Sequence, residues 1–282
     1  MTVLEVLQAS TDYFKKRNVE SARLNAEHLL AHALGRKRID LYLEFDRGLT
    51  EEELAPLRDL VRQRGEGRPL QHLLGTAEFC GLTFLCDKRA LVPRPETEEL
   101  VELLISRYAG SNGKDELTVL DVGTGSGVIA LSLAAKLPNA RVYGVDLSED
   151  ALTLARENAD RLGLSARVDF QQGDLLENVQ ERFDLVVANL PYISHGERDA
   201  LSREVLHDPE VALFGGEQGH ELIRKLIDQA AERLTPQGVV ALEIGASQRD
   251  AVISAFTQKK YKDIEAKTDY SGTPRFVFAR YG

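Results

Sequence analysis

Cysteine is scarce in this chain of 282 residues, which has only Cys80 and Cys86. No Cys/His cluster with metal-ligand spacing accompanies them, so no metal site is expected and both are interpreted as reduced core thiols. No uninterrupted apolar run approaches the length of a membrane span. The start, Met1 to Glu5, has no basic region ahead of an apolar core, so no secretion signal is predicted. These absences favour a soluble, cytoplasmic protein without a bound metal or a membrane.

Positive charge is also in deficit, because 35 lysines and arginines face 45 aspartates and glutamates, for a formal net charge of −10. Sequence-independent binding to nucleic acid draws its affinity from neutralising phosphates. A modest basic patch of Arg62, Arg64 and Arg68 can coexist with the acidic total. We nevertheless expect no direct, stable binding to nucleic acid.

The chain is long enough for a large domain and a small one. Residues 1–75 predict a bundle of short helices, in which Ser21 is an expected N-cap and Thr50-Glu51-Glu52-Glu53 an expected capping box. Residues 76–92 are expected to form a linking β-hairpin, because the pattern between Phe79 and Val92 is β-like, with Gly81 and Cys86-Asp87-Lys88 as turn material. Residues 93–282 are expected to form the main domain. The helical segment contains no catalytic constellation.

From Leu117 onward, apolar strands and amphipathic helices alternate, which is typical of an α/β domain with a mostly parallel sheet. The expected strands are 117–121, 141–146, 167–171, 183–188 and 238–243, and the expected helices are 127–137, 149–162, 219–234 and 247–257. The last two expected strands, 263–268 and 275–280, should form an antiparallel hairpin at the sheet edge. Ligands of such sheets bind at the carboxyl ends of the strands.

The stretch from Leu120 to Gly127 predicts a strand, a tight turn and a helix. Glycines allow the sharp turn and the close approach of a cofactor, and the helix start offers free N–H groups. A dinucleotide fingerprint would place its third glycine at position 128, which is valine, so a nicotinamide-dependent dehydrogenase is disfavoured. Asp-x-Gly-x-Gly-x-Gly instead resembles the first motif of S-adenosylmethionine-dependent methyltransferases. The cofactor turn then comprises Asp121, Gly123, Thr124, Gly125, Ser126 and Gly127.

Acidic residues follow the next two strands. Asp146 ends the second strand of the alternating unit, where a carboxylate can accept hydrogen bonds from ribose hydroxyls, and Ser148 suits the helix N-cap better. Asp174 follows the third strand and could accept from an adenine amino group, with Leu175 packing on the ring. An ordinary turn aspartate is an equally good interpretation of Asp174.

The tetrapeptide Asn189-Leu190-Pro191-Tyr192 directly follows the fourth strand. The nitrogen of a carboxamide or a base amine attacks a sulfonium methyl group poorly, because its lone pair is delocalised. Acceptors that hold both N–H hydrogens orient this nitrogen without a strong base. Asn189 Oδ1 and the Leu190 carbonyl are candidate acceptors, and Tyr192 could stack on the planar target. As a plain structural feature, the tetrapeptide would be a strand-ending turn.

These motifs, together with Pro93-Arg94-Pro95-Glu96-Thr97-Glu98 and the helical segment with Arg68-Pro69-Leu70, resemble the HemK/PrmC family over essentially the whole chain. The resemblance implies a Rossmann-like S-adenosylmethionine-dependent methyltransferase domain behind a small helical bundle that grips the substrate. It also implies methyl transfer to the side-chain amide of the glutamine in the Gly-Gly-Gln motif of peptide-chain release factors, in translation termination. Glu96 is interpreted as a helix-start residue and not as a base.

One position departs from the family pattern, which is usually Asn-Pro-Pro-Tyr: Leu190 stands where the first proline is expected. The backbone carbonyl remains, so we expect activity with some loss of loop rigidity. Two alternatives stay open on the sequence. An adenine-amino methyltransferase acting on DNA or RNA would suit the tetrapeptide equally well, and a non-enzymatic module could bind S-adenosylmethionine and act through partners.

Overall fold

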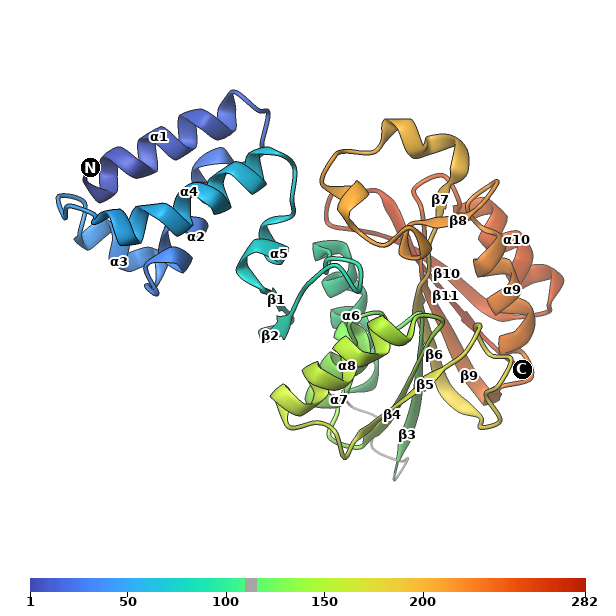
Figure 1. The fold of residues 1–282 in the computed structure, drawn as a ribbon. Helices are drawn as coiled ribbons and strands as arrows, with labels where there is room; N and C mark the ends of the chain where they lie inside the picture. The colour runs from blue at the N-terminus through green and yellow to red at the C-terminus, as the bar shows by residue number, and fades with distance from the viewer. Residues whose placement is uncertain (110–115) are drawn as a thin grey trace. The chain divides into compact units, whose positions relative to one another are not determined.

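A computed structural model describes residues 1–109 and 116–282. The chain divides into two compact units, which Figure 1 shows as a ribbon. The helical unit comprises Met1–Thr76 and Ser202–His207, and the sheet unit comprises Ala77–Leu201 and Asp208–Gly282. No helix in the described part of the chain is long and apolar enough to cross a membrane.

The helical unit is built from five helices around its own apolar core. They are α1 (Val3–Lys15), α2 (Ala22–Ala33), α3 (Arg38–Leu43), α4 (Glu51–Gly65) and α5 (Leu70–Leu74). The expected capping box opens α4, where Thr50 Oγ1 accepts from Glu53 N and Glu53 Oε2 accepts from Thr50 N. Ser21 precedes α2 as predicted but makes no capping bond through its side chain, because its backbone is left-handed with φ +47°. The prediction of a serine cap is therefore wrong in its chemistry.

The expected basic patch does not form a free cationic surface. Arg64 is buried, with 5% of its surface exposed, and donates to Asn25 Oδ1 at 2.7 Å and to Glu204 Oε2 at 2.7 Å. Arg62 is exposed but pairs with Asp59 and Glu66. Packing inside the helical unit therefore uses the charge of Arg64 and local ion pairs use that of Arg62, while Arg68 stays exposed and donates to the neutral amide of Gln63.

The sheet unit contains a seven-stranded sheet in the order β10-β11-β9-β6-β3-β4-β5. Its strands are β3 (Leu117–Val122), β4 (Ala140–Asp146), β5 (Val168–Gln172), β6 (Phe183–Asn189), β9 (Leu234–Glu243), β10 (Lys262–Thr268) and β11 (Pro274–Arg280). The pairs among β9, β6, β3, β4 and β5 are parallel, and β11 lies antiparallel to both β9 and β10. The predicted mostly parallel sheet with an antiparallel hairpin at its edge is confirmed.

Helices surround this sheet, and short elements follow β6. The helices are α6 (Pro95–Tyr108), α7 (Val128–Lys136), α8 (Glu149–Leu162), α9 (Glu221–Ala230) and α10 (Arg249–Gln258). The short elements are β7 (Ile193–Ser194), η1 (His195–Ala200), η2 (Val205–His207), η3 (Glu210–Ala212) and β8 (Phe214–Gly216), of which η2 belongs to the helical unit. The helix predicted over 219–234 is shorter, because the chain enters β9 at Leu234.

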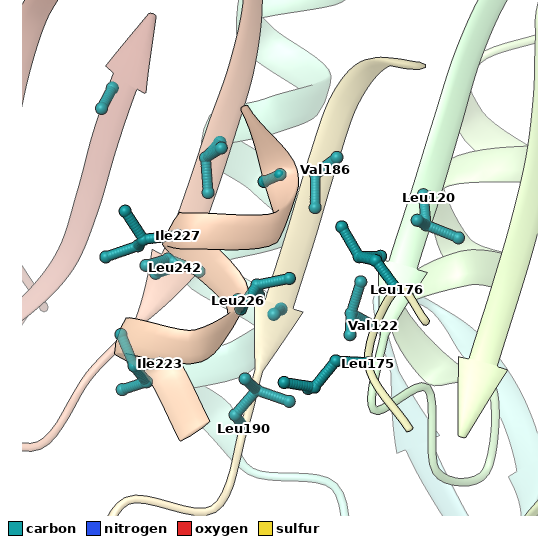
Figure 2. Packing of buried hydrophobic residues seen from close by; sticks show 14 of the residues in the cluster. Leu120, Val122, Leu175, Leu176, Val186, Leu190, Ile223, Leu226, Ile227 and Leu242 are labelled. Carbon is teal, nitrogen blue, oxygen red and sulfur yellow. The ribbon is translucent and has the colours of Figure 1, made fainter. Parts of the chain in front are cut away.

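Both faces of the sheet are buried, which explains the apolar strands. Along β3, Leu120 and Val122 lie in one core cluster and Val119 lies in the other, because successive side chains point to opposite faces. Figure 2 shows part of the first cluster, in which Leu190 and Leu175 lie near Ile223 of α9. Burial on both faces is typical of parallel sheets covered by helices.

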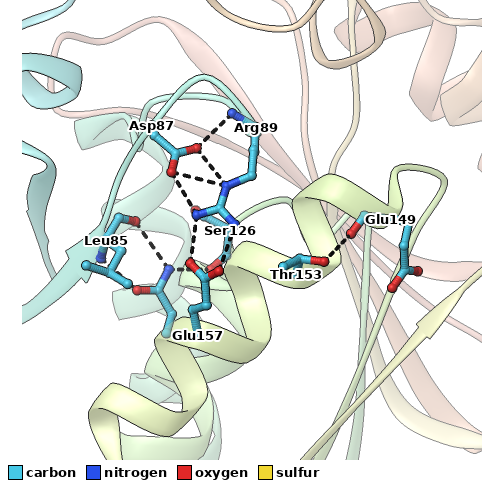
Figure 3. A network of polar contacts seen from close by, with 8 residues as sticks. Leu85, Asp87, Arg89, Ser126, Glu149, Thr153 and Glu157 are labelled. Carbon is cyan, nitrogen blue, oxygen red and sulfur yellow. Dashed lines mark hydrogen bonds and ion pairs between the residues drawn. The ribbon is translucent and has the colours of Figure 1, made fainter.

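The β-hairpin lies earlier than its predicted pattern. Its strands are β1 (Thr76–Phe79) and β2 (Leu82–Leu85), joined through Cys80 and Gly81, whose φ values are positive. Residues 86–92 form an irregular segment instead of a strand. Arg89 there donates to both carboxylate oxygens of Asp87 and of Glu157 on α8 (Figure 3). This ion-pair network fixes the turn that was expected at Cys86-Asp87-Lys88, but no strand follows the turn.

Candidate active site

The turn between β3 and α7 has the backbone that its glycines predict. Gly123, Gly125 and Gly127 have φ of +71°, +55° and +81°, a region that L side chains rarely adopt. A Cβ at Gly123 would lie 2.9 Å from Leu190 Cδ2, and one at Gly127 would lie 3.0 Å from Leu131 Cδ1. The backbone conformation therefore favours glycine at these positions, and at Gly123 and Gly127 a Cβ would also require a leucine side chain to shift.

Asp121 supports this turn from within the core. Its side chain is fully buried, and Oδ2 accepts from Thr124 Oγ1 at 2.7 Å and from Ala130 N at 3.1 Å. Burial raises the pKa of this carboxyl to about 7, although both hydrogen bonds act in the opposite direction. Asp121 does not line the cavity described next, so the structure places it under the turn.

A cavity opens beside the turn, within the sheet unit. Ten of the residues predicted for the site line it: Gly123, Thr124, Gly125, Ser126, Asp146, Asp174, Leu175, Asn189, Leu190 and Pro191. Gly127 and Tyr192 are not among the lining residues. The cavity lies at the carboxyl ends of β3, β4 and β6, where the topology predicts a ligand. Sequence positions up to 68 apart are thus brought to one site, as the strand alternation implied.

Asp146 joins the end of β4 to the glycine turn. Its Oδ2 accepts from Gly125 N at 2.8 Å and its Oδ1 from Ser148 N at 2.9 Å, while Ser148 Oγ caps α8 by accepting from Ala151 N. Burial raises the pKa of Asp146 against these backbone bonds. Each carboxylate oxygen has a further lone pair, so the group can still accept from a ligand hydroxyl.

Asp174 and Leu175 form the opposite wall. Asp174 Oδ2 accepts from Lys225 Nζ of α9 at 2.8 Å, so an ion pair holds this aspartate. Leu175 has a φ of +51°, unusual for a branched side chain, and its side chain packs in the core cluster of Figure 2. Such backbone strain is found where a site requires it.

The Asn189 motif follows β6 directly. Asn189 Nδ2 donates to Thr97 Oγ1 at 2.9 Å, and Leu190 is 3% exposed and packs in the core. Burial raises the pKa of Tyr192, whose carbonyl accepts from Gln248 Nε2 at 2.8 Å. The side chain of Leu190 therefore holds this part of the motif in place by packing in the core, whereas the ring of a proline would stiffen the backbone instead.

Sequence reasoning missed two buried residues beside Asn189. Thr97, in the first turn of α6, donates through Oγ1 to Glu243 Oε2 at 2.7 Å. Glu243 is the last residue of β9 and pairs in register with Asn189. A polar residue at the end of a buried strand was the signal that identified Asp146 and Asn189, and the same signal was available for Glu243.

Two expectations concern cysteines and metals. Both Cys80 and Cys86 are free thiols, as predicted, and burial raises their pKa values to about 11 and about 12. Among the described residues, no group of three or more His, Cys, Asp or Glu side chains could hold a metal ion. The absence of a metal cofactor stays a prediction.

Comparison with known proteins adds independent findings. The family model for a "Methyltransferase domain" matches residues 113–266, and the "PrmC N-terminal domain" model matches residues 5–75. The release factor glutamine methyltransferase of Geobacter sulfurreducens is 41% identical over 100% of this chain and 97% of its own length. The enzyme of the same name from Rhodopirellula baltica is 41% identical over 98% of this chain and 95% of its own.

Solved structures agree on the fold. The 16S rRNA N2 G1207 methyltransferase of T. thermophilus, in complex with AdoMet and guanosine, superposes with a TM-score of 0.52 at 22% identity. The match covers 73% of this chain and 50% of that one, which supports the methyltransferase fold alone. The family assignment comes from the full-length relatives and the two matching family models: the chain belongs to the family of release factor glutamine methyltransferases.

Proposed function

We propose that the protein transfers a methyl group from S-adenosylmethionine to the side-chain amide nitrogen of the glutamine in the Gly-Gly-Gln motif of a peptide-chain release factor. The observation that carries the proposal is the amide of Asn189 at the rim of the cavity, with Nδ2 already bound to Thr97. The full-length relatives named for this activity support it.

The residues of the cavity fit S-adenosylmethionine. Gly123 and Gly125 leave backbone exposed to the cavity, and Ser126 Oγ lines the same wall with no hydrogen-bond partner among the described residues. When bound, the cofactor supplies an electrophilic methyl group on a sulfonium sulfur. Asp146 would accept from the ribose hydroxyls, and Asp174 with Leu175 would border the adenine. The two carboxylates thus match the hydroxyl and amino donors of the cofactor.

Asn189 and Leu190 would orient the target. Asn189 Oδ1 and the Leu190 carbonyl would accept the two N–H groups of the glutamine amide, so that its nitrogen faces the methyl group. The new N–C bond forms as the S–C bond breaks, and the nitrogen then releases one proton to solvent. Pro191 would stiffen the motif, and Tyr192 would flank the planar amide. Positioning and acceptor groups, and no strong base, drive this chemistry.

We further propose the division into a recognition domain of residues 1–75, a hairpin linker of residues 76–92 and a catalytic domain of residues 93–282. The helical domain would bind the release factor, which fits its lack of a catalytic constellation. The cytoplasmic location and the absence of stable nucleic-acid binding stay predictions.

The test is methyl incorporation from labelled S-adenosylmethionine into three candidates: a release factor, the same factor with its loop glutamine changed to alanine, and duplex DNA. We expect label in the intact factor alone. Asn189→Ala should abolish it, and Gln258→Ala, which removes an exposed amide on α10, should not. Label in DNA and in neither factor would overturn the proposal in favour of an adenine-amino methyltransferase.

A further inference from the structure

Three side chains from three elements form a hydrogen-bonded chain that begins at Asn189 and Thr97, which both line the cavity, and ends at Glu243, which does not. Asn189 ends β6, Thr97 lies in the first turn of α6, and Glu243 ends β9. Asn189 Nδ2 donates to Thr97 Oγ1 at 2.9 Å, and Thr97 Oγ1 donates to Glu243 Oε2 at 2.7 Å. Thr97 is 3% exposed and Glu243 is 1% exposed. Water therefore has little access to replace either bond.

The protons of this chain determine its direction. An ionised carboxylate only accepts, so the single hydroxyl proton of Thr97 goes to Glu243. Thr97 Oγ1 can then only accept from Asn189, which must present Nδ2 and not Oδ1. The Asn189 amide is thereby held in one of its two flip states, with Oδ1 left over as an acceptor.

We propose that Thr97 and Glu243 are positioning residues, which hold the Asn189 amide so that its acceptor oxygen, and not its donor nitrogen, meets the target glutamine. This inference rests on the proposed function and deepens it. If the Asn189 amide were flipped, its N–H donors would face the N–H donors of the target glutamine, and the glutamine nitrogen would lose an acceptor. Thr97 lines the cavity and Glu243 does not, and the positioning role of both acts through the Asn189 amide.

The surroundings of Glu243 make the direction of the chain depend on pH. Burial raises the pKa of this carboxyl to about 7, while Thr97 and Asn189 lower it by hydrogen bonding. Arg275 on β11 lowers the pKa through its charge, and Glu96 on α6 raises it. The Arg275 guanidinium also donates to the Ile244 carbonyl at 3.1 Å and pairs with Asp269 at 3.5 Å. Among the described residues, Glu243 therefore has no hydrogen-bonded cation.

Protonation would remove the constraint. A neutral Glu243 can donate its own proton to Thr97 Oγ1, and the Thr97 proton is then free to bond Asn189 Oδ1 in the flipped amide. The ionised form is the one that favours activity, so activity is present above the pKa and lost as pH falls through about 7. Tyr192 is also coupled to Glu243 by charge, but burial raises the pKa of that phenol further above neutral.

The first experiment compares Thr97→Val with Thr97→Ser at saturating concentrations of both substrates. Valine keeps the shape and removes the hydroxyl, so we expect kcat to fall about 10- to 100-fold with the KM for the release factor little changed. Serine keeps the hydroxyl and should stay within about threefold of the wild type. The affinity for S-adenosylmethionine, measured by calorimetry, should be the same in both variants. If Thr97 had only a structural role, the two variants would not differ in kcat while this affinity stays unchanged.

The second experiment is the pH profile of kcat. In the wild type, kcat should fall about tenfold per pH unit below about 7, and Glu243→Gln should remove this slope. Asp121 also has a pKa of about 7, but it supports the cofactor turn. Asp121→Asn is therefore the matched control, which should keep the slope in kcat.

A third measurement needs no activity. The side-chain amide signal of Asn189 in ¹⁵N–¹H spectra, assigned by its loss in Asn189→Ala, should shift with a midpoint near pH 7 in the wild type and not in Glu243→Gln. This readout also serves if Thr97→Val does not fold.

The outcomes separate the inference from the proposed function. A wild-type kcat in Thr97→Val, a pH slope that survives in Glu243→Gln, or an Asn189 signal that does not titrate would overturn the positioning role while glutamine transfer stands. Failure of the wild type to label the release factor would overturn the proposed function instead. The Asn189 signal would then still decide whether Glu243 controls the amide.

Discussion

Two buried glutamates, one in each unit of the protein, have pKa values shifted in opposite directions. Glu27 in α2 is 3% exposed and accepts from Arg23 Nε at 2.8 Å, Arg38 Nη2 at 2.9 Å and Tyr42 Oη at 2.7 Å. Burial alone would raise its pKa, but these three donors outweigh burial and lower it to about 2. Glu27 therefore stays ionised at any physiological pH.

Glu243 is buried as deeply, at 1% exposed, but its pKa is about 7. Its hydrogen-bonded neighbours are two neutral groups, the Thr97 hydroxyl and the Asn189 amide, and the described residues show no ion pair to it. The neighbouring groups, and not the depth of burial, therefore decide whether each glutamate is ionised near neutral pH. A carboxylate that holds helices together is neutralised by cations, whereas the one beside the candidate site is left able to titrate near neutral pH.

The largest effect is expected from Glu27→Ala. Removing the carboxylate leaves Arg23 and Arg38 without their shared partner, and breaking such a buried pair costs about 2–4 kcal/mol of unfolding free energy. Because the folded pKa is lowered, the stabilisation is present above the unfolded pKa and lost as pH falls from about 4.5 to about 2. Urea unfolding followed by circular dichroism measures both effects.

The control for this variant is Asp46→Ala, which removes an exposed acid of the same unit. It should leave the stability of the helical unit unchanged. An equal loss in the two variants would show that the three donors around Glu27 contribute nothing specific.

Glu243→Gln should change the free energy of unfolding in the opposite direction and stabilise the protein. The folded pKa is raised, so the ionised carboxylate opposes folding increasingly as pH rises from about 4.5 toward about 7. The neutral amide should therefore stabilise the sheet unit by about 1–3 kcal/mol at about pH 8, and by almost nothing near pH 4.5. A thermal scan at both pH values measures the difference, and a gain that is the same at both would contradict the titration of Glu243.

Asp121→Asn tests another buried carboxyl of the sheet unit whose pKa is raised to about 7. Asparagine keeps an oxygen for Thr124 Oγ1 and Ala130 N but loses the charge, which weakens both bonds. We expect the Kd for S-adenosylmethionine to rise about three- to tenfold in calorimetry, with little change in kcat at saturating cofactor. Asp150→Asn, at an exposed position of α8, is the control. A fall in kcat alone would assign Asp121 to the chemistry and not to the turn.

The features that the sequence predicted well are local. The alternation of strands with helices and the glycine turn follow from side-chain period and from backbone freedom, so β3, α7 and β6 lie within one or two residues of their predicted bounds. The strand ends then bring Asp146 and Asn189 to one cavity, because parallel strands share a carboxyl edge.

The features that the sequence did not reveal depend on distant partners. Thr97 and Glu243 are 146 positions apart, and only the folded sheet places them beside Asn189. Arg89 fixes the segment after the expected turn through Glu157, 68 positions away, where the β-like pattern toward Val92 favoured a second strand. A side chain's chemistry can be read from its type, but the partner that sets its proton or its charge comes from the tertiary fold.

The smallest effect is expected from Tyr42→Phe, which removes one of the three donors to Glu27. Tyr42 is 46% exposed, and the two arginines continue to neutralise the carboxylate, so Tm should fall by only about 1–4 °C. Tyr13→Phe is the matched control, because Tyr13 contacts Arg17 through its ring. Thr97→Val gives the sharper contrast. Removing a neutral donor should hardly change the pKa of Glu27, which keeps its two cations, but should raise the pKa of Glu243, whose hydrogen-bonded neighbours are both neutral. A Tm loss in Tyr42→Phe as large as in Glu27→Ala would show that the hydroxyl, and not the arginines, keeps Glu27 ionised.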